Sequence, residues 1–400
     1  MPSALRVLFI ASAYPRFEGD VITPWLGATI AHLRGVGVDV EVLAPAYHGS
    51  PDHIVDGVPV HRFRYATSAW EMLSHDNPIP WQLSERPIRL GLVPGYVLAA
   101  AAAATRLARS ERFDVVHAFW PVPHAVPGLI ARRLTGIPLV STFFGAELHW
   151  LARKHGWARW AVRAIVSQSD AVTAISTHTA NQLRVVAPAA QPFVVPFGAA
   201  TSLAAADAHV PHEGEQAFLF VGRLVARKGV DVLLAALSQL DDARLVIVGD
   251  GAERQALEEQ TRHLGIADRV KFTGYLPRTE LEAYLQSCLA LVLPAVTNEV
   301  AGTEGLGVAL IEALSYGRPV IASDVGGIPD VVIHERTGLL VPEGDAMALA
   351  RAMERLERDH AFACELGERG RAHVQDRFSW SAIVGALRSI YDTAITRRAT

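Results

Sequence analysis

The stretch AFLFVGRLVARKGVDVLLAAL, residues 217–237, predicts one strand, one loop and one helix. Its first apolar run ends at Gly222, and aliphatic residues recur at helical spacing after Gly229. A short apolar run bounded by glycine is typical of a strand that is buried on both faces, as in parallel sheets whose crossovers are helices. The stretch therefore predicts an α/β fold.

The same alternation extends along the chain in both directions. Before residue 199 the apolar runs are RVLFIAS, DVEVLAP, DVVHAF and PLVSTFF, and after residue 237 they are ARLVIVGD, RVKFTGY, LALVLPA, PVIASD and TGLLVPE. Helical patterns lie between these runs, so each set predicts a Rossmann-like, doubly wound parallel sheet. Two such domains would face a central cleft beside the carboxyl ends of their strands, where such sheets bind ligands.

Domain boundaries follow from changes in composition. Residues 199–216 are small or polar and show no apolar period, which predicts a linker between a domain at 1–198 and a second domain at 217–380. The final residues, 381–400, place apolar side chains at helical spacing. We expect this helix to pack back on the first domain, because its apolar face needs a surface to cover.

The composition of the chain is that of an ordinary globular enzyme. The 400 residues are 50% hydrophobic and 20% charged, and the formal net charge of -4 gives no field that would recruit nucleic acid. The two cysteines, Cys288 and Cys364, are too few for a disulfide framework, which favours a reducing, cytoplasmic compartment. The apolar stretch from Leu90 to Ala108 is rich in alanine, and we expect a helix of a soluble domain there.

Two cations follow the strand that ends at Gly222. Arg223 and Lys228 lie in the loop before a helix N-terminus, an arrangement that suits a phosphate group. The alternative is a pair of solvated surface charges. Glycines on either side favour the phosphate site, because they let the backbone approach a ligand closely.

Gly249 and Gly251 follow the next strand and suggest a dinucleotide motif. Its third glycine position is Arg254, so a tight turn that lines the cleft is the better interpretation.

Two carboxylates lie eight residues apart in TEGLGVALIEAL, residues 303–314. Glu304 precedes a glycine-spaced turn, whereas Glu312 lies within a helix that is otherwise mostly aliphatic. An ionised carboxylate there needs either a structural partner or a ligand that carries donor groups. The free amides from Gly305 to Val308 at the helix start would suit an anionic oxygen or sugar hydroxyls.

Six ordered segments carry a resemblance to a known family. They are GRLVARKG, VIVGDGAERQALE, VKFTGYLP, TEGLGVALIEAL, GRPVIASDVGGIPDVV and TGLLVPEGD. Together they resemble the retaining glycosyltransferases of family four, which have the GT-B fold, and the resemblance extends over essentially the whole chain.

The resemblance implies a role for each matching residue. Arg223 and Lys228 would hold the diphosphate of the donor, Glu304 would contact the transferred sugar, and Glu312 would accept from the ribose. Backbone between Phe272 and Tyr275 would receive the base. The full donor-side set is Gly19, Gly222, Arg223, Lys228, Gly249, Phe272, Tyr275, Glu304, Gly305, Leu306, Gly307, Val308 and Glu312, with Glu304, Arg223 and Lys228 as the catalytic group.

The first domain departs from the family pattern at two places. YPRFEGDVITP would place Gly19 beside the phosphates, but Asp20 stands where a second glycine is frequent, and we expect its carboxylate to point elsewhere. In STFFGAELHW, Phe144 stands where many relatives carry a histidine.

Other residues of the first domain are acceptor-side candidates. His117 and His124 follow or end a strand and are possible substitutes for the missing histidine, with packing as the alternative. Glu147 matches an acidic position of the family.

Two segments bear on the acceptor. Residues 150–166 would either lie on an anionic bilayer as a basic amphipathic helix or pack their tryptophans on the sheet. Residues 68–87 would form either an acceptor loop or a plain surface connection.

The expected reaction is transfer of a sugar from a nucleotide diphosphate sugar, with UDP- or GDP-sugars favoured, to a glycan, a lipid-linked acceptor or a small molecule. We expect no metal and no other cofactor, and a location in the cytoplasm or at the inner face of the membrane. The alternatives are a nucleotide-sugar epimerase or hydrolase and a noncatalytic sugar-nucleotide binder.

Overall fold

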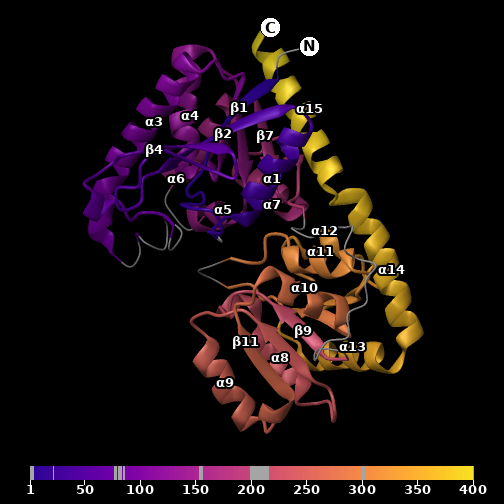
Figure 1. The fold of residues 1–400 in the computed structure, drawn as a ribbon. Helices are drawn as coiled ribbons and strands as arrows, with labels where there is room; N and C mark the ends of the chain where they lie inside the picture. Colours follow the sequence, from indigo (N-terminus) through magenta and orange to yellow (C-terminus); the bar gives the residue numbers. More distant parts are fainter. Residues whose placement is uncertain are drawn as a thin grey trace. The chain divides into compact units, whose positions relative to one another are not determined.

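The computed structural model describes residues 4–20, 22–75, 79, 83, 86–152, 156–198, 216–298 and 302–399. The chain forms two compact units, Met1–Pro196 with Trp380–Thr400, and Phe197–Ser379. Figure 1 shows both units coloured along the sequence. The expected linker at 199–216 lies outside the described residues except for Gln216.

The first unit contains a sheet in which the described residues form eight strands, in the order β3-β4-β2-β1-β5-β6-β7-β8. All neighbours pair in parallel except β3 and β4, which form an antiparallel edge. The strands are β1 Leu5–Ile10, β2 Val38–Pro45, β3 His53–Val55, β4 Val58–Phe63, β5 Val115–Phe119, β6 Leu139–Phe143, β7 Ala171–Ala174 and β8 Phe193–Val194.

Helices cover both faces of this sheet. They are α1 Pro24–Gly35, η1 Ser68–Trp70, η2 Pro87–Leu92, α3 Val93–Ser110, α4 Pro121–Thr135, α5 Ala146–Ala152, α6 Gly156–Gln168, α7 Thr177–Val186 and α15 Trp380–Ala399. Successive side chains of a strand point to opposite faces, so β5 contacts two helix layers. Val116 packs beside Gly128 of α4, whereas His117 contacts Tyr391 of α15.

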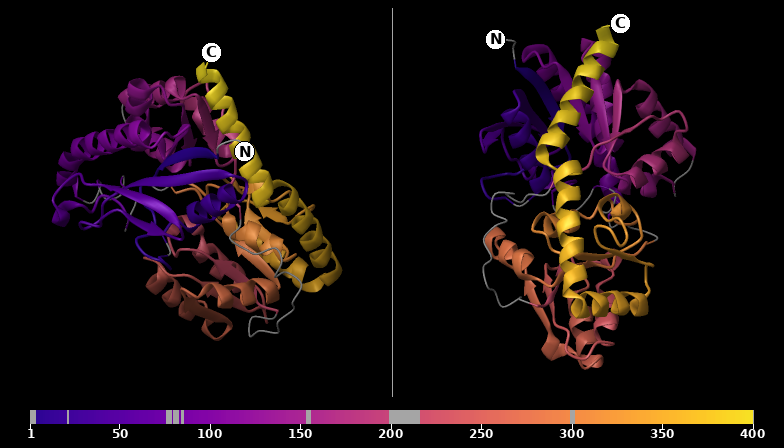
Figure 2. Two further views of the ribbon diagram at one scale, coloured as in Figure 1. Left: turned by 45° about the horizontal axis from the view of Figure 1, so that its top comes forward. Right: turned by 90° about the vertical axis from the view of Figure 1, so that its right-hand side faces the viewer.

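The last helix, α15, belongs to the first unit, as expected. It contacts β5, β6, β7 and α1 and runs along that unit in Figure 2. Its buried residues include Leu387, Ile390, Tyr391 and Ala394, which recur at helical spacing. The apolar pattern near the end of the chain is therefore explained by burial against this sheet.

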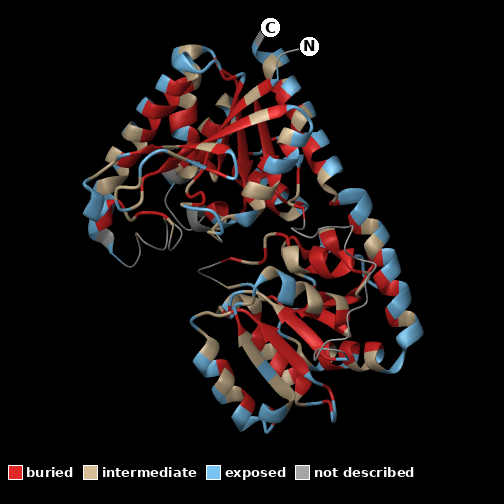
Figure 3. Ribbon diagram, viewed as in Figure 1, coloured by how far each residue is buried: buried red, intermediate tan, exposed pale blue. Residues whose placement is uncertain are grey.

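The second unit contains a fully parallel sheet, whose described strands follow the order β11-β10-β9-β12-β13-β14. The strands are β9 Phe218–Val221, β10 Leu245–Val248, β11 Val270–Gly274, β12 Ala290–Leu293, β13 Val320–Ser323 and β14 Leu339–Val341. The strand order reverses between β9 and β12, which is the doubly wound topology predicted from the alternation. Figure 3 shows the strands of both units mostly buried and the outer sides of the helices exposed.

The helices of the second unit are η4 Ala226–Lys228, α8 Val230–Leu237, α9 Arg254–His263, η5 Ala267–Arg269, α10 Arg278–Ser287, α11 Val308–Ser315, α12 Ile328–Val331, α13 Ala346–Arg358 and α14 His360–Arg377. Their aliphatic faces and the strands form one continuous core. Gly249 illustrates how tightly it is closed. Its φ is +132°, and a Cβ there would lie 2.0 Å from the carbonyl oxygen of Gly222.

The alanine-rich helix packs on the first unit. By length and composition, Ile88–Ser110 is the one described stretch that could cross a membrane. However, α3 contacts α4, β2 and β4, and it buries Tyr96, Ala100, Ala104 and Leu107. One side of this helix is therefore part of the core.

Two further expectations fall partly outside the described residues. The segment 68–87 begins with η1 but includes masked positions between 76 and 85, and the segment 150–166 forms parts of α5 and α6 but lacks residues 153–155. The apolar runs did not predict the β3–β4 hairpin or the short strands β7 and β8.

Burial of Tyr391 generates a stability prediction. Its hydroxyl lies 2.9 Å from Nδ1 of His117, and both side chains are fully buried. Tyr391→Phe should lower the free energy of unfolding by about 1–3 kcal/mol, because it leaves a buried imidazole nitrogen without a partner. All eight tryptophans fall within the sequence of the first unit, so urea denaturation followed by tryptophan fluorescence reports on it.

The control is Thr393→Val on the same helix, because that hydroxyl donates to the carbonyl of Ser389 within the helix and has no further hydrogen bond among the described residues. Its unfolding midpoint should stay within about 0.5 kcal/mol of the parent. Equal midpoints for the Tyr391→Phe variant and the parent would show that the contact contributes nothing.

Candidate functional site

The candidate site of the second unit lies where the strand order reverses. β9 and β12 are neighbours in the sheet, and both end at the same edge because they run in parallel. The loop after β9 carries the two predicted cations, and the loop after β12 leads to Glu304. Crossovers that leave in opposite directions open a crevice at such a point, which is where doubly wound sheets bind ligands.

Close backbone contacts hold these two loops together. Gly229 has a φ of +64°, and a Cβ there would lie 1.9 Å from the carbonyl oxygen of Pro294. The N–H of Val296 donates to the carbonyl of Arg227 at 2.9 Å. Only glycine allows this approach, so the second glycine of GRLVARKG has a defined role in setting the position of the cations.

The cations and the first carboxylate form a compact cluster. Nζ of Lys228 lies 2.7 Å from Oε2 of Glu304, and Nη1 of Arg227 lies 3.3 Å from the same oxygen. The single turn η4 places both cations on the side of Glu304. The two loops, 76 residues apart in sequence, therefore meet through a charged contact.

Glu304 is buried, yet it remains ionised. Burial opposes ionisation, but the charges of Lys228 and Arg227, the hydrogen bond from Lys228 and the N–H of Gly307 outweigh it and lower the pKa of Glu304 to about 2. Its carbonyl accepts from the N–H of Gly327 at 2.9 Å. Both the backbone and the side chain of this residue are thus fixed.

Arg223 differs from its two neighbouring cations. It is exposed, and within the described part of the chain its side chain has no hydrogen-bond or ion-pair partner. Its carbonyl accepts from the N–H of Val225, which keeps the loop turned. Its guanidinium, in the same loop as Lys228, is exposed and therefore accessible to an anion.

The start of α11 has the geometry expected of a helix that receives an anion or a hydroxyl. Gly307 caps it with a φ of +84°, Leu306 is buried, and Gly305 and Val308 are half-buried. The amide of Gly307 already donates to the carboxylate of Glu304. The remaining first-turn amides belong to residues that lie near the same carboxylate.

The second carboxylate has a structural partner. Oε1 of Glu312 lies 2.7 Å from Nη1 of Arg278, which also contacts Glu282 through Nε. This ion pair explains how the largely aliphatic helix accommodates a charge. Nη2 of Arg278 is buried and makes no hydrogen bond within the described residues, so a donor remains beside Glu312. The expected contact of Glu312 with a ribose stays a prediction.

The residues expected near the base lie at the ends of β10 and β11. Gly249 donates its N–H to the carbonyl of Gly274 at 2.8 Å, which joins the two strand ends. Phe272 packs partly into the core, whereas Tyr275 is exposed and donates its hydroxyl to the carbonyl of Asp250 at 3.4 Å. Tyr275 therefore borders solvent, and the expected contact of this backbone with the base stays a prediction.

In the first unit, Gly19 and Asp20 form a turn after β1. Gly19 has a φ of +87°, which explains the glycine by backbone conformation. Oδ2 of Asp20 accepts from Nε of Arg16 at 2.7 Å. Burial would raise the pKa of Asp20, but its hydrogen bonds to Arg16 lower it. The expected redirection of this carboxylate thus has a local partner.

The two candidate histidines are buried and satisfied. His117 contacts Tyr391 through Nδ1 and Thr142 through Nε2. His124 contacts Tyr96 through Nε2 and the carbonyl of Trp120 through Nδ1. Burial lowers the pKa of His117 to about 3 and that of His124 to about 4. The packing interpretation accounts for both rings, which are neutral at physiological pH.

Phe144, at the position of the family histidine, belongs to an aromatic cluster. Its ring stacks on Trp120 with centroids 4.1 Å apart and lies 5.4 Å from Trp25. Phe144, which stands where the family pattern has histidine, is therefore surrounded by other aromatic side chains.

Glu147 follows Phe144 by three residues and is buried. Its Oε1 accepts from the N–H of Phe144 at 2.7 Å, while Oε2 has no hydrogen-bond partner among the described residues. Burial raises the pKa of Glu147 to about 7, although backbone N–H groups of Phe144, Glu147 and Gly145 oppose the shift. This carboxyl is therefore poised to be neutral or charged near physiological pH.

Sequence reasoning missed two cations of the second unit. Arg227 stands beside Lys228 in the motif, so its proximity to Glu304 could have been inferred once a single turn was assumed. Arg278 lies 34 residues from Glu312, and no local pattern links them. Only the packing of α10 against α11 reveals that pair.

Comparison with known proteins identifies the family. The model described as glycosyl transferases group 1 matches residues 174–373, and the glycosyl transferase 4-like domain matches residues 23–198. The chain belongs to the group 1 glycosyl transferases. It is a glycosyltransferase enzyme, and the family prediction drawn from the six segments is confirmed at this level.

Relatives span nearly the whole chain. It is 33% identical to the GDP-mannose-dependent alpha-(1-6)-phosphatidylinositol monomannoside mannosyltransferase of Mycobacterium tuberculosis, covering 96% of this chain and 97% of the relative. It is 28% identical to the glycogen synthase of the same species, over 97% and 94% of the two chains.

Solved structures support the GT-B fold. The sucrose-phosphate synthase of Thermosynechococcus elongatus matches with a TM-score of 0.77 and 25% identity, over 98% of this chain and 99% of that chain. HepE of Anabaena, in complex with UDP and glucose, matches with a TM-score of 0.70 and 18% identity, over 97% and 100%. The glycosyltransferase therefore has the predicted GT-B fold.

The pairing of Lys228 with Glu304 generates a binding prediction. The carboxylate of Glu304 is paired with Lys228, the lysine that the motif is expected to direct to phosphate. Glu304→Gln should therefore tighten binding of UDP or GDP by about tenfold, because the phosphate no longer competes with a carboxylate for Lys228. Isothermal titration calorimetry with each diphosphate measures the change.

A matched control is Glu368→Gln, which removes one exposed carboxylate of the same unit. Its affinity for either diphosphate should equal that of the parent. Unchanged or weaker binding by the Glu304→Gln variant would contradict competition between the carboxylate and phosphate.

The raised pKa of Glu147 generates a pH prediction. The folded chain holds the proton more tightly than the unfolded chain, so this contribution to stability is present below about pH 4.5 and is lost as pH rises through about 7. Glu147→Gln is neutral throughout and should gain stability relative to the parent between pH 5 and 8. Urea denaturation at both pH values measures the gain.

The exposed Glu18→Gln substitution serves as the control, since it should show no such pH-dependent difference. The same difference between the Glu147→Gln variant and the parent at pH 5 and pH 8 would exclude a raised pKa at this position.

Proposed function

We propose that this glycosyltransferase transfers a sugar from a nucleoside diphosphate sugar to a glycan or lipid-linked acceptor, with retention of the anomeric configuration and without a metal ion. The observation that carries the proposal is the contact of Lys228 and Arg227 with Glu304 at the reversal of strand order, in a loop that also carries the exposed Arg223. A cationic pair beside a fixed carboxylate fits a ligand that carries both a diphosphate and sugar hydroxyls.

The chemistry follows from where charge develops. The bond between the anomeric carbon and the diphosphate oxygen breaks, so negative charge grows on the leaving phosphate. Arg223 and Lys228 would stabilise that charge, and loss of one such donor typically lowers the rate by about 100 to 1,000 fold. In a retaining reaction, the oxygen of the acceptor hydroxyl would bond to the anomeric carbon on the face that the diphosphate leaves. A phosphate oxygen would take the proton of that hydroxyl.

Arg227 gives the cluster a way to exchange partners. When the diphosphate takes Lys228, Glu304 would otherwise be a buried carboxylate without a cation, which is costly. Arg227 lies 3.3 Å from the same oxygen and would keep Glu304 ionised. The carboxylate would then be free to accept hydrogen bonds from hydroxyls of the transferred sugar.

The donor and acceptor classes are drawn from the relatives. HepE was solved with UDP and glucose, and the mycobacterial mannosyltransferase is named for GDP-mannose and a phosphatidylinositol mannoside. These names support a nucleotide sugar as donor and a glycan or lipid-linked molecule as acceptor. They favour UDP- and GDP-sugars for the first screen.

The test begins with the donor. UDP-, GDP- and ADP-sugars are screened for thermal stabilisation of the protein, because a ligand that binds only the folded state raises Tm. Release of the nucleoside diphosphate is then measured with candidate acceptors, and product stereochemistry is read by NMR. An inverted anomeric configuration would contradict retention, and no stabilisation by any nucleotide would contradict the donor site.

Substitutions then test the assigned residues. We expect Glu304→Ala to lower transfer by at least about 100-fold, and Arg223→Ala to weaken binding of the diphosphate as well. Arg244→Ala, at an exposed arginine outside the cluster, is the matched control and should leave both unchanged. Parental kinetics in both site variants would remove the assignment.

A further inference from the structure

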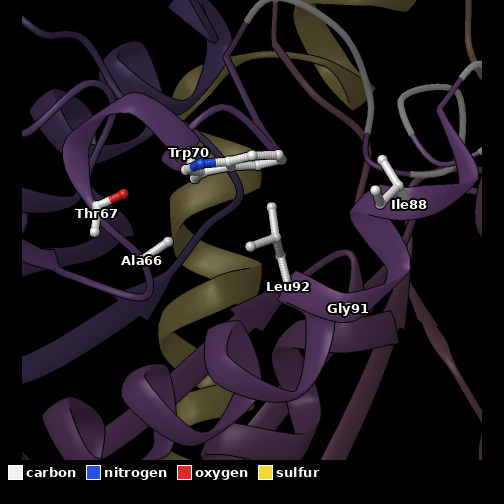
Figure 4. Close-up of a pocket in the computed structure, with 6 residues that line it drawn as sticks. All are labelled: Ala66, Thr67, Trp70, Ile88, Gly91 and Leu92. Carbon is white, nitrogen blue, oxygen red and sulfur yellow. The ribbon is translucent and has the colours of Figure 1, made fainter.

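An apolar surface of the first unit has no role in the donor site. Residues after the carboxyl end of β4 and within η2 line a shallow, solvent-open pocket of about 440 Å³, formed by Ala66, Thr67, Trp70, Ile88, Gly91 and Leu92. Figure 4 shows the ring of Trp70 facing the side chain of Leu92, with Ile88 to one side. Its volume lies within the range of small-molecule pockets, and its lining is almost entirely apolar.

The apolar character continues from the pocket onto the outside of α3. Ile88 is 77% exposed, Leu98 is 67% exposed, and Leu90 is also exposed. Along α3, Leu98 and Ala102 are exposed at a spacing of four residues, opposite the buried side that packs on the core. Large aliphatic side chains exposed together in this way mark a contact surface.

Cations complete the same surface. The exposed face of α3 continues from Ala102 to Arg106 and Arg109, and Arg86 precedes η2. These three arginines are exposed, and within the described part of the chain their side chains have no partner. Residues 86–112 carry five arginines, of which Arg89 is buried, and one glutamate, in a chain whose net charge is -4.

We propose that the exposed face of η2 and α3 docks on an anionic phospholipid bilayer, with an acyl chain entering the pocket lined by Trp70 and Ile88. We name this face, from Arg86 to Arg109 with Trp70, the docking face. Aliphatic side chains would enter the interfacial region, the arginines would contact lipid phosphates, and tryptophan is enriched at that depth.

A second copy of the chain fits this face less well than a bilayer does. In a twofold contact the same surface appears on both partners, so the arginines of one copy would face those of the other. Juxtaposed like charges oppose such a contact. An anionic bilayer offers opposite charge and an apolar interior together.

The pocket lies at a useful edge of the sheet. β1, β4, β5 and β6 run in the same direction, so the pocket after β4 shares its edge with the turn at Gly19 and with Glu147. A lipid held by its chain in the pocket would present its head group along this edge. This consequence rests on the proposed function, whereas docking itself does not.

Vesicle flotation tests the docking face without requiring enzyme activity. The probes are vesicles of phosphatidylcholine alone and of an equimolar mixture with phosphatidylglycerol. We expect binding to the anionic vesicles only, weakened by salt. Arg106→Gln with Arg109→Gln should weaken it by about 25-fold, since each basic residue near the surface contributes about fivefold. Arg244→Gln with Arg351→Gln, two exposed arginines of the second unit, is the matched control.

A second pair of variants tests the apolar contribution. Ile88→Ser with Leu98→Ser should reduce binding at least tenfold, whereas Leu134→Ser with Trp160→Ser should not, although these control residues are 56% and 71% exposed. Loss of binding only in the control pair would overturn the proposal and assign docking to α4 and α6. Binding that is equal to both kinds of vesicle, or absent, would also overturn it.

Fluorescence tests the pocket. Vesicles whose acyl chains carry bromine should quench the tryptophan fluorescence of the parent protein. The Ile88→Ser with Leu98→Ser variant should show less quenching, because it binds the vesicles less. Trp70→Phe should remove most of this same part of the quenching, because Trp70 lines the pocket. Equal quenching in the Trp70→Phe variant and the parent would overturn entry of the chain into the pocket. A Tm and an affinity for UDP or GDP equal to those of the parent show that each variant is folded. If the parent forms an oligomer without lipid, and only the docking-face variants lose it, the face binds a second copy of the chain and the proposal is overturned.

Discussion

The proposed donor site of the second unit depends on one buried contact between two loops that the sheet brings together. β9 and β12 end side by side at the reversal of strand order, and the ion pair of Lys228 with Glu304 joins the loops that follow them. The close approach of Gly229 to Pro294 fixes the distance between the backbones. In the proposed reaction the diphosphate would take Lys228 from Glu304, and Arg227 would keep the carboxylate paired while charge develops on the leaving group.

Two buried carboxyl groups show how surroundings decide ionisation. Glu304 is surrounded by two cations and an amide, which keep it charged despite burial, whereas Glu147 is buried with backbone donors alone and has a raised pKa. The first suits a fixed charge within a donor site. The second suits a group that gains or loses its proton near neutral pH, and it follows the aromatic cluster of Phe144 and Trp120 in the chain.

Helix α3 of the first unit has a buried side and an exposed side of different composition. The alanine-rich helix buries one side against α4 and leaves leucine and arginine on the other. Composition alone describes α3 as apolar, and its overall hydropathy hides the separation of the two sides. The fold separates them because a helix presents residues three and four apart on one face.

The sequence by itself determined the two parallel sheets, most of their strands, the returning last helix and the family, because apolar periodicity and ordered motifs are local properties. Glycines and charges at strand ends also led to the prediction that Lys228 and Glu304 bind a donor, and that role stays a prediction. Only the tertiary structure decided that Arg227 and Lys228 share one oxygen of Glu304. It also decided that Arg278 forms an ion pair with Glu312 and that His117 is hydrogen-bonded to Tyr391. Such partners lie tens to hundreds of residues apart, and their meeting depends on how whole elements pack, which no local pattern encodes.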